Sequence, residues 1–148
     1  MIQRILVGYD DGVLSQKALE TVIEMAGSTK AEIFIVSALD VPLMISSPDA
    51  LPPDNISITK FFFDNTLLYF QKLQEQAAAK VKEKGLAVTT KVLEGPPGKS
   101  LIKYAEEIKA DLIAVGSNNK TMLDRFFLGS VSNYVIQHAK CMVLLAKN

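Results

Sequence analysis

The sequence predicts a doubly wound α/β fold, in which helices cover both faces of a five-stranded parallel sheet. Short apolar, β-branched runs alternate along the chain with longer segments whose apolar residues recur at helical spacing. Such alternation of strand and helix requires right-handed crossovers between parallel strands. With 148 residues the chain is long enough to bury one core, so we expect a single domain over residues 1–148.

Apart from the third, which contains two Thr residues and a Lys, the five expected strands are continuous apolar runs, as is typical of strands that are buried on both faces. They lie at residues 5–7, 33–36, 88–93, 112–115 and 143–145. The expected helices fill the gaps, at residues 15–25, 58–84, 99–109 and 129–139. Gly27 and Gly85 follow the first two helical patterns, and we expect each glycine to end its helix.

Residues 40–57 interrupt this pattern, because they are rich in proline and show no period. They follow the second strand at the end where open α/β sheets bind ligands. A long connection of this kind is either functional or a surface excursion, and both interpretations stay open. In the next helix Phe61, Phe62 and Phe63 cannot all face one side, since consecutive helical residues are about 100° apart. At least one ring therefore points away from the main core.

Composition excludes several function classes. The 16 Lys and Arg residues balance 16 Asp and Glu residues, so there is no basic excess to favour nucleic acid or an anionic membrane. Cys141 has no partner for an internal disulfide, which favours a reducing compartment. No apolar run approaches the roughly 20 residues that span a bilayer, and the first residues do not resemble a secretory signal. We expect a cytoplasmic protein without nucleic-acid or membrane partners.

The end of the first predicted strand carries residues suited to a ligand. The strand ends in Gly8, Tyr9 and Asp10, and a carboxylate there can accept hydrogen bonds from ribose hydroxyls or a base amine. In a sheet of order 3-2-1-4-5 the crossover direction reverses between strands one and four. Asp10 and Gly116 are therefore expected to face one cleft. In the alternative interpretation Asp10 or Asp11 is the N-cap of the following helix.

The start of the last predicted helix is a candidate anion site. Gly129, Ser130, Val131 and Ser132 stand there, where free N–H groups and the helix dipole favour negative charge. A serine hydroxyl at this point can donate to a phosphate oxygen. The alternative is that Gly129 is a turn residue and Ser130 an N-cap.

The sequence contains no pattern of a catalytic or metal site. His138 has no Cys, Asp or Glu at ligand spacing, and there is no Ser-His-Asp, Cys-His or Walker lysine pattern. Hydrolysis needs a positioned water and a base, for which Asp10 and Asp11 are the only nearby candidates. We therefore assign no catalytic residue and no metal ligand, and expect any hydrolysis to be slow or absent.

Five segments of the chain together resemble the universal stress protein family. They are ILVGYD followed by SQKAL in residues 5–19, LEGPP in 93–97, ADLIAVGS in 110–117, LGSVS in 128–132 and AKCMVL in 139–144. The order and spacing of these segments make the resemblance specific, and it covers nearly the whole chain. The resemblance implies an adenine nucleotide alpha hydrolase-like fold and a cytoplasmic, dimeric stress-response module. It also implies that ATP or AMP binds between strands one and four, with Mg²⁺ able to accompany the phosphates.

The resemblance also assigns the residues of the nucleotide site. These are Gly8, Tyr9, Asp10, Ala38, Val115, Gly116, Asn119, Gly129, Ser130, Val131 and Ser132. Asp10 matches the aspartate that contacts adenosine in the binding members, and Ala38 matches a main-chain contact to adenine. Asn119 stands where those members have a glycine, although asparagine tolerates positive φ better than other residues. The departure leaves an alternative open: a dimeric module that binds a protein partner and no nucleotide.

The last strand bears on assembly. In the order 3-2-1-4-5 it lies at a sheet edge, and an apolar edge strand favours pairing with a second copy. The family resemblance implies the same. We expect a homodimer through Met142–Ala146.

Overall fold

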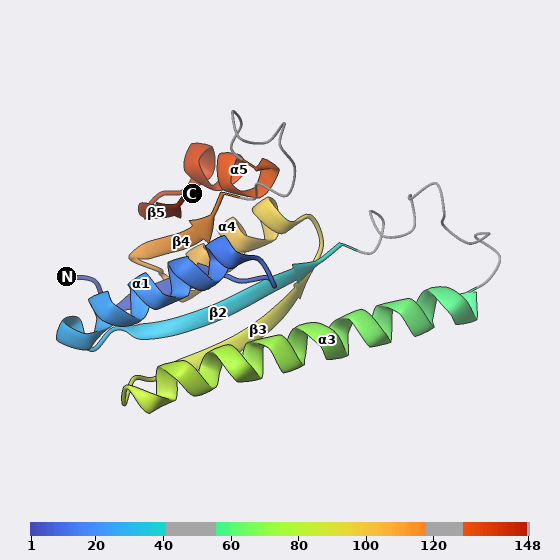
Figure 1. Cartoon of the computed structure of the whole chain (residues 1–148). Coiled ribbons are helices and arrows are strands. Elements are labelled where there is room, and N and C mark those ends of the chain that lie inside the picture. The colour runs from blue at the N-terminus through green and yellow to red at the C-terminus, as the bar shows by residue number, and fades with distance from the viewer. Residues whose placement is uncertain (41–55, 118–128, 148) are drawn as a thin grey trace.

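The computed structural model describes residues 1–40, 56–117 and 129–147 (Figure 1). At its centre is a five-stranded parallel sheet of order β3-β2-β1-β4-β5. The strands are β1 (Arg4–Gly8), β2 (Glu32–Leu39), β3 (Val88–Glu94), β4 (Leu112–Gly116) and β5 (Met142–Ala146). The predicted fold class and strand order are confirmed.

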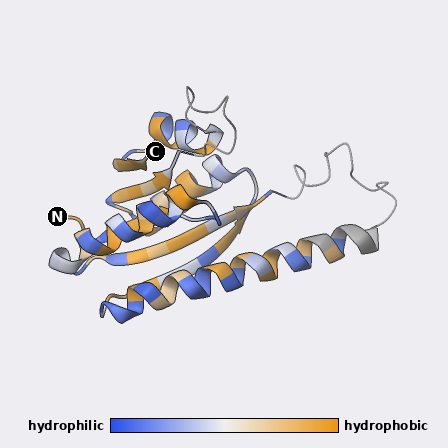
Figure 2. Cartoon of the chain, viewed as in Figure 1, coloured by the Kyte–Doolittle hydropathy of each residue, from blue (hydrophilic) through white to orange (hydrophobic). Residues whose placement is uncertain are grey.

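Helices cover both faces of the sheet. They are α1 (Val13–Thr29), α3 (Ile56–Glu83), α4 (Pro97–Ile108) and α5 (Ser130–His138). Helices α1 and α3 pack on one face, and α4 and α5 on the other. Figure 2 shows strands that are largely hydrophobic and helices in which hydrophobic and hydrophilic residues alternate, as in amphipathic helices. No helix within the described ranges is long and apolar enough to cross a membrane.

The sheet separates two hydrophobic cores. Alternate residues of a strand point to opposite faces, so Ile5 and Val7 of β1 pack beneath α1 and α3. Leu6 between them packs on the opposite face, with Leu101 of α4 and Val135 of α5. All three β1 side chains are fully buried, which explains why the sequence shows an unbroken apolar run here.

The ends of the first two helices differ in how well the sequence predicts them. Gly27 does not end α1, which continues to Thr29. Lys30 is the residue that adopts the left-handed conformation, with φ 58°, and its N–H donates to the Ala26 carbonyl at 2.8 Å. Gly85, with φ +71°, follows the end of α3, as predicted.

Helix α3 continues past the carboxyl end of β2 (Figure 1). Phe61, near the start of α3, is 64% exposed, which confirms that at least one ring of the phenylalanine run points away from the core. Residues 41–55, which make up most of the aperiodic stretch, lie outside the described ranges.

Asp111 fixes the start of β1 at the end of the sheet opposite the predicted cleft. Its Oδ2 accepts hydrogen bonds from the backbone N–H groups of Gln3, at 2.8 Å, and Arg4, at 2.9 Å. These two donors lower the pKa of Asp111 below its ordinary value. Since the folded-state pKa is the lower one, the interaction stabilises the protein above the unfolded-state pKa. That stabilisation is lost as the pH falls through the folded-state pKa.

The variant Asp111→Asn is therefore expected to be less stable than the wild type at neutral pH and to lose less stability in acid. An amide has the same shape but accepts hydrogen bonds more weakly than a carboxylate. Urea unfolding between neutral pH and about pH 3 measures both effects. Parallel stability curves for the two proteins over this range would contradict the assignment.

Candidate functional site

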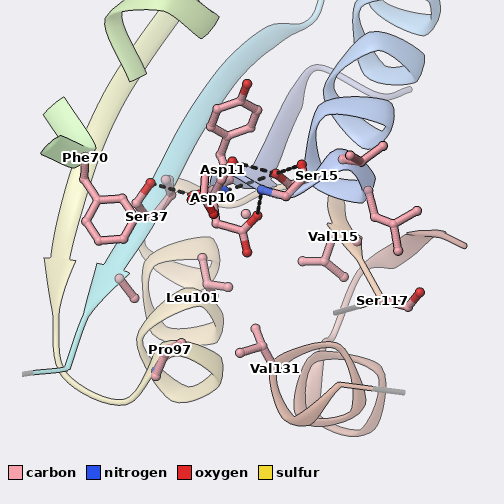
Figure 3. A pocket seen from close by; sticks show the side chains of 18 of the residues that line it. Asp10, Asp11, Ser15, Ser37, Phe70, Pro97, Leu101, Val115, Ser117 and Val131 are labelled. Atoms are coloured by element: carbon pink, nitrogen blue, oxygen red, sulfur yellow. Dashed lines mark hydrogen bonds between the residues drawn. The ribbon is translucent and has the colours of Figure 1, made fainter. Parts of the chain in front are cut away.

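A cleft of about 690 Å³ opens at the carboxyl ends of β1, β2 and β4 (Figure 3). It lies at the point where the crossover direction of the sheet reverses. Seven of the residues predicted for the site line it: Gly8, Tyr9, Asp10, Ala38, Val115, Gly116 and Val131. The structure therefore brings Asp10 and Gly116 to one cleft, as the predicted strand order requires.

A tight turn after β1 fixes the Asp10 carboxylate. Its Oδ1 accepts a hydrogen bond from the Gly12 N–H at 2.7 Å. The Ser15 hydroxyl donates to the Asp10 carbonyl at 2.9 Å and accepts from the Asp10 N–H at 3.1 Å. A Cβ on Gly12 would lie 2.9 Å from Asp10 Oδ1, so this position suits glycine. Figure 3 shows the carboxylate directed into the cleft.

The N-cap of α1 is Gly12, so the alternative in which Asp10 or Asp11 caps this helix is wrong. Asp10 holds the turn before the cap instead. Asp11 also lines the cleft, and its Oδ2 accepts a hydrogen bond from the Tyr69 hydroxyl of α3 at 3.0 Å. The two neighbouring carboxylates thus have different partners.

Gly116 is needed for packing as well as for access to the cleft. A Cβ at this position would lie 2.8 Å from the carbonyl carbon of Leu14 and 2.9 Å from the backbone nitrogen of Ser15. The first turn of α1 therefore rests directly on the end of β4. Ser117 follows, and its N–H donates to the Ala146 carbonyl at 2.9 Å, which ties this end of β4 to β5.

The start of α5 differs in detail from the expectation. Gly129 is the N-cap and Ser130 the first helical residue, so the alternative that makes Ser130 the N-cap is wrong. Ser132 is fully buried, and its hydroxyl donates to the Gly129 carbonyl at 3.0 Å. In the part of the chain that the structure describes, Val131 is the α5 residue that lines the cleft. Asn119 lies outside the described residues.

Sequence reasoning missed the two helical walls of the cleft. On one side α3 contributes Thr66, Tyr69 and Phe70, and on another α4 contributes Pro97 and Leu101. The spacing of the apolar residues in α3 was the available signal, because its inward stripe continues beyond the residues that pack on the sheet. Using it requires knowing that α3 runs past the end of β2.

Ser37 is a further lining residue that the sequence did not single out, and it belongs to a buried polar chain. Its hydroxyl donates to the Tyr9 carbonyl at 2.7 Å and accepts from Gln74 Nε2 at 3.1 Å. Both side chains are almost fully buried. The chain of hydrogen bonds links α3 through β2 to the end of β1, next to Asp10.

In the cleft, aspartate carboxylates that can accept hydrogen bonds lie next to tyrosine hydroxyls that stay uncharged. Burial raises the pKa of Tyr9, and the charge of Asp10 raises it further. The hydrogen bond to Asp11 raises the pKa of Tyr69, with smaller contributions from burial and the two aspartate charges. Both phenols therefore stay protonated at neutral pH. Asp10 can accept from a ligand hydroxyl or amine, and the apolar walls can enclose a flat ring.

The comparisons with known proteins agree with this architecture. The model of the universal stress protein family matches residues 1–147. Universal stress protein MJ0531 of Methanocaldococcus jannaschii is 32% identical over 148 residues, which span 99% of this chain and 83% of the relative.

Two solved structures are also similar. The universal stress protein UspA from Lactobacillus plantarum shares the fold with a TM-score of 0.82 at 21% identity, covering 98% of this chain and 97% of its own. A universal stress protein solved in complex with cAMP has a TM-score of 0.68 at 25% identity, covering 99% of this chain and 97% of its own. The extent of the family match and the shared fold lead to one conclusion: the chain belongs to the universal stress protein family.

Proposed function

We propose that this protein is a cytoplasmic, single-domain stress-response module that binds an adenine nucleotide, ATP or AMP, in the cleft between β1 and β4. The observation that carries the proposal is the Asp10 carboxylate, which the turn after β1 holds facing the cleft. A carboxylate in this place is suited to accept hydrogen bonds from the two ribose hydroxyls. The cAMP complex of a relative at 25% identity supports an adenine ligand.

The remaining parts of the nucleotide follow from this placement. The base lies toward the end of β2, where Ala38 lines the cleft. The phosphates extend toward Gly116 and the N-terminus of α5, where Gly129, Ser130 and Ser132 contribute to an electropositive helix end. Mg²⁺ accompanies the phosphates when the ligand is ATP. Asn119 belongs to this phosphate side in the family pattern.

The nucleotide acts as a ligand that selects a conformation rather than as a rapidly hydrolysed substrate. Among the described lining residues, Asp10 and Asp11 are the carboxylates available as a base. Both already accept hydrogen bonds from the protein, Asp10 from Gly12 and Asp11 from Tyr69. A ligand shifts a conformational equilibrium only through different affinities for the two states.

Calorimetric titration with ATP, AMP and cAMP tests the proposal. Saturable binding of at least one of them, with one site per subunit and a raised melting temperature, is the expected result. No heat and no thermal shift with any of the three would overturn it. The protein would then fit the alternative, a dimeric module that binds a protein partner and no nucleotide. The asparagine at position 119, where nucleotide-binding members have a glycine, favours this alternative.

The same proposal includes a homodimer through β5. This strand lies at the edge of the sheet, and Met142 on it is 55% exposed. Light scattering at micromolar concentration is expected to give twice the subunit mass, and Met142→Lys is expected to shift the protein toward monomer. Leu68→Lys is the matched control, since Leu68 is 52% exposed but lies on α3, which packs on the β2–β3 side of the sheet. Monomer mass for the wild type would contradict the dimer.

A further inference from the structure

The inward face of α3 continues from the core into the cleft. Val81, Ala77 and Gln74 lie on this face and are buried against the sheet. Phe70 is the next position along the same stripe, one helical turn before Gln74. At Phe70 the stripe reaches the cleft, which this residue lines together with Ser37 of β2. Figure 3 shows the half-buried Phe70 ring reaching from α3 to the side of the cleft where Ser37 lies.

Hydrogen bonds anchor α3 on both sides of Phe70. Gln74 Nε2 donates to the Lys91 carbonyl of β3 at 2.8 Å and to Ser37 Oγ of β2 at 3.1 Å. On the other side, the Tyr69 hydroxyl donates to Asp11 Oδ2 at 3.0 Å. The segment of α3 that carries Phe70 is thus fixed both to the sheet and to the turn after β1.

The Tyr69 and Phe70 rings also contact each other. Their centroids are 5.7 Å apart, with an interplanar angle of 66°, which is the edge-to-face arrangement that aromatic pairs prefer. The hydrogen bond from Tyr69 to Asp11 therefore restrains the position of the neighbouring ring. A wall that is held in place before binding costs a ligand less ordering entropy.

The side of the cleft across from Phe70 is apolar. Figure 3 places Val115 there and shows Leu101 and Val131 below Asp10, and each of these three residues lines the cleft. Asp10 lies between Phe70 and Val115 in the same view. An aromatic ring on one side, aliphatic side chains on the other and a carboxylate between them suit a flat base that carries a hydroxylated sugar.

We propose that Phe70 stacks on the purine base of the bound nucleotide and that Tyr69 is a positioning residue, which holds Phe70 through its hydrogen bond to Asp11. This inference rests on the nucleotide binding proposed above and names the residues that select the base. A purine has a larger stacking face than a pyrimidine, so the aromatic wall favours AMP over CMP.

Calorimetric titrations with AMP, ATP and CMP test the stacking residue in Phe70→Leu and Phe70→Tyr. Leucine keeps an apolar side chain without a π-face, and we expect AMP and ATP affinity to fall by about tenfold or more, as for other base–aromatic stacks. In Phe70→Leu the ratio of the AMP affinity to the CMP affinity should be smaller than in the wild type. Tyrosine keeps the ring and is expected to retain the wild-type affinity. Phe61→Leu is the matched control, since Phe61 lies on the same helix but does not line the described cleft.

Proton NMR of bound AMP gives a readout that a purely structural role would not change. Stacking on Phe70 should shift the H2 and H8 resonances of the base upfield, and the shift should be lost in Phe70→Leu. Tyr69→Phe removes the hydrogen bond but keeps the ring, and is expected to weaken AMP binding several-fold and to reduce the shift. Asp11→Asn leaves Tyr69 a weaker acceptor oxygen and should weaken AMP binding less than Tyr69→Phe does.

The outcomes separate this inference from the proposed function. If the wild type binds AMP or ATP and Phe70→Leu binds equally well, with unchanged base resonances, Phe70 is not the stacking residue and the proposed function stands. If Asp11→Asn and Tyr69→Phe affect AMP binding in the opposite order, the positioning role of Tyr69 is wrong. A wild type that binds none of the nucleotides overturns both.

Discussion

Replacing Gly116 by alanine is expected to lower the free energy of unfolding by about 1–3 kcal/mol, the usual cost of overpacking. The added Cβ would lie 2.8 Å from the Leu14 carbonyl carbon and 2.9 Å from the Ser15 nitrogen. Both are backbone atoms, so neither can rotate away as a flexible side chain would. The first turn of α1 must move instead, and it carries the Ser15 hydroxyl that holds Asp10. We therefore expect Gly116→Ala to weaken nucleotide binding as well.

Gly27→Ala is the matched control for this prediction. Gly27 lies within α1, and a Cβ there would meet nothing within 4 Å. Alanine is the better helix former by roughly 0.5–1 kcal/mol, so this variant should be slightly more stable than the wild type. Urea unfolding of the three proteins compares them directly. Equal stability of Gly116→Ala and the wild type would show that β4 and α1 are not in close contact.

The variant Asp10→Asn is expected to lose about 10- to 100-fold in nucleotide affinity while keeping its stability. A hydrogen bond to a charged group contributes about 1.5–3 kcal/mol, which corresponds to this range. The asparagine Oδ1 can still accept from the Gly12 N–H, as Asp10 Oδ1 does at 2.7 Å, so the turn should persist. Calorimetric titration with AMP and ATP, together with urea unfolding, measures both quantities.

Asp111→Asn is the reciprocal control for Asp10→Asn. Asp111 accepts two backbone hydrogen bonds at the opposite end of the sheet, so its variant should lose stability but no nucleotide affinity. Comparing the two variants thus separates effects on stability from effects on nucleotide affinity. If both variants bound nucleotide like the wild type, the ribose contact assigned to Asp10 would be wrong.

The fold could be predicted because parallel strands that are buried on both faces are recognisable in the sequence. The runs at Ile5–Val7 and Ile33–Val36 are apolar without interruption, since both faces of the sheet are covered. The end of α1 was harder to predict. Glycine is a stronger signal for the end of a helix than lysine is. Of Gly27 and Lys30, however, only Lys30 takes the left-handed conformation. Local propensity does not reveal which residue meets the turn into β2.

The site was predictable where it depends on strand order and unpredictable where it depends on tertiary packing. Asp10 and Gly116 follow from strand ends and the crossover reversal. Phe70 lines the cleft because of where α3 packs against β2 and β3, which the sequence pattern does not give. Ser132 presents a third case, since its hydroxyl bonds back to Gly129, a local alternative that serine side chains often adopt.

The most direct test of nucleotide binding is to denature the freshly purified protein and identify any released nucleotide by mass spectrometry. We expect an adenine nucleotide at close to one molecule per subunit, which would establish the cleft as occupied in the cell and identify its ligand. A protein that releases none, and whose melting temperature does not change when ATP or AMP is added, would contradict the account.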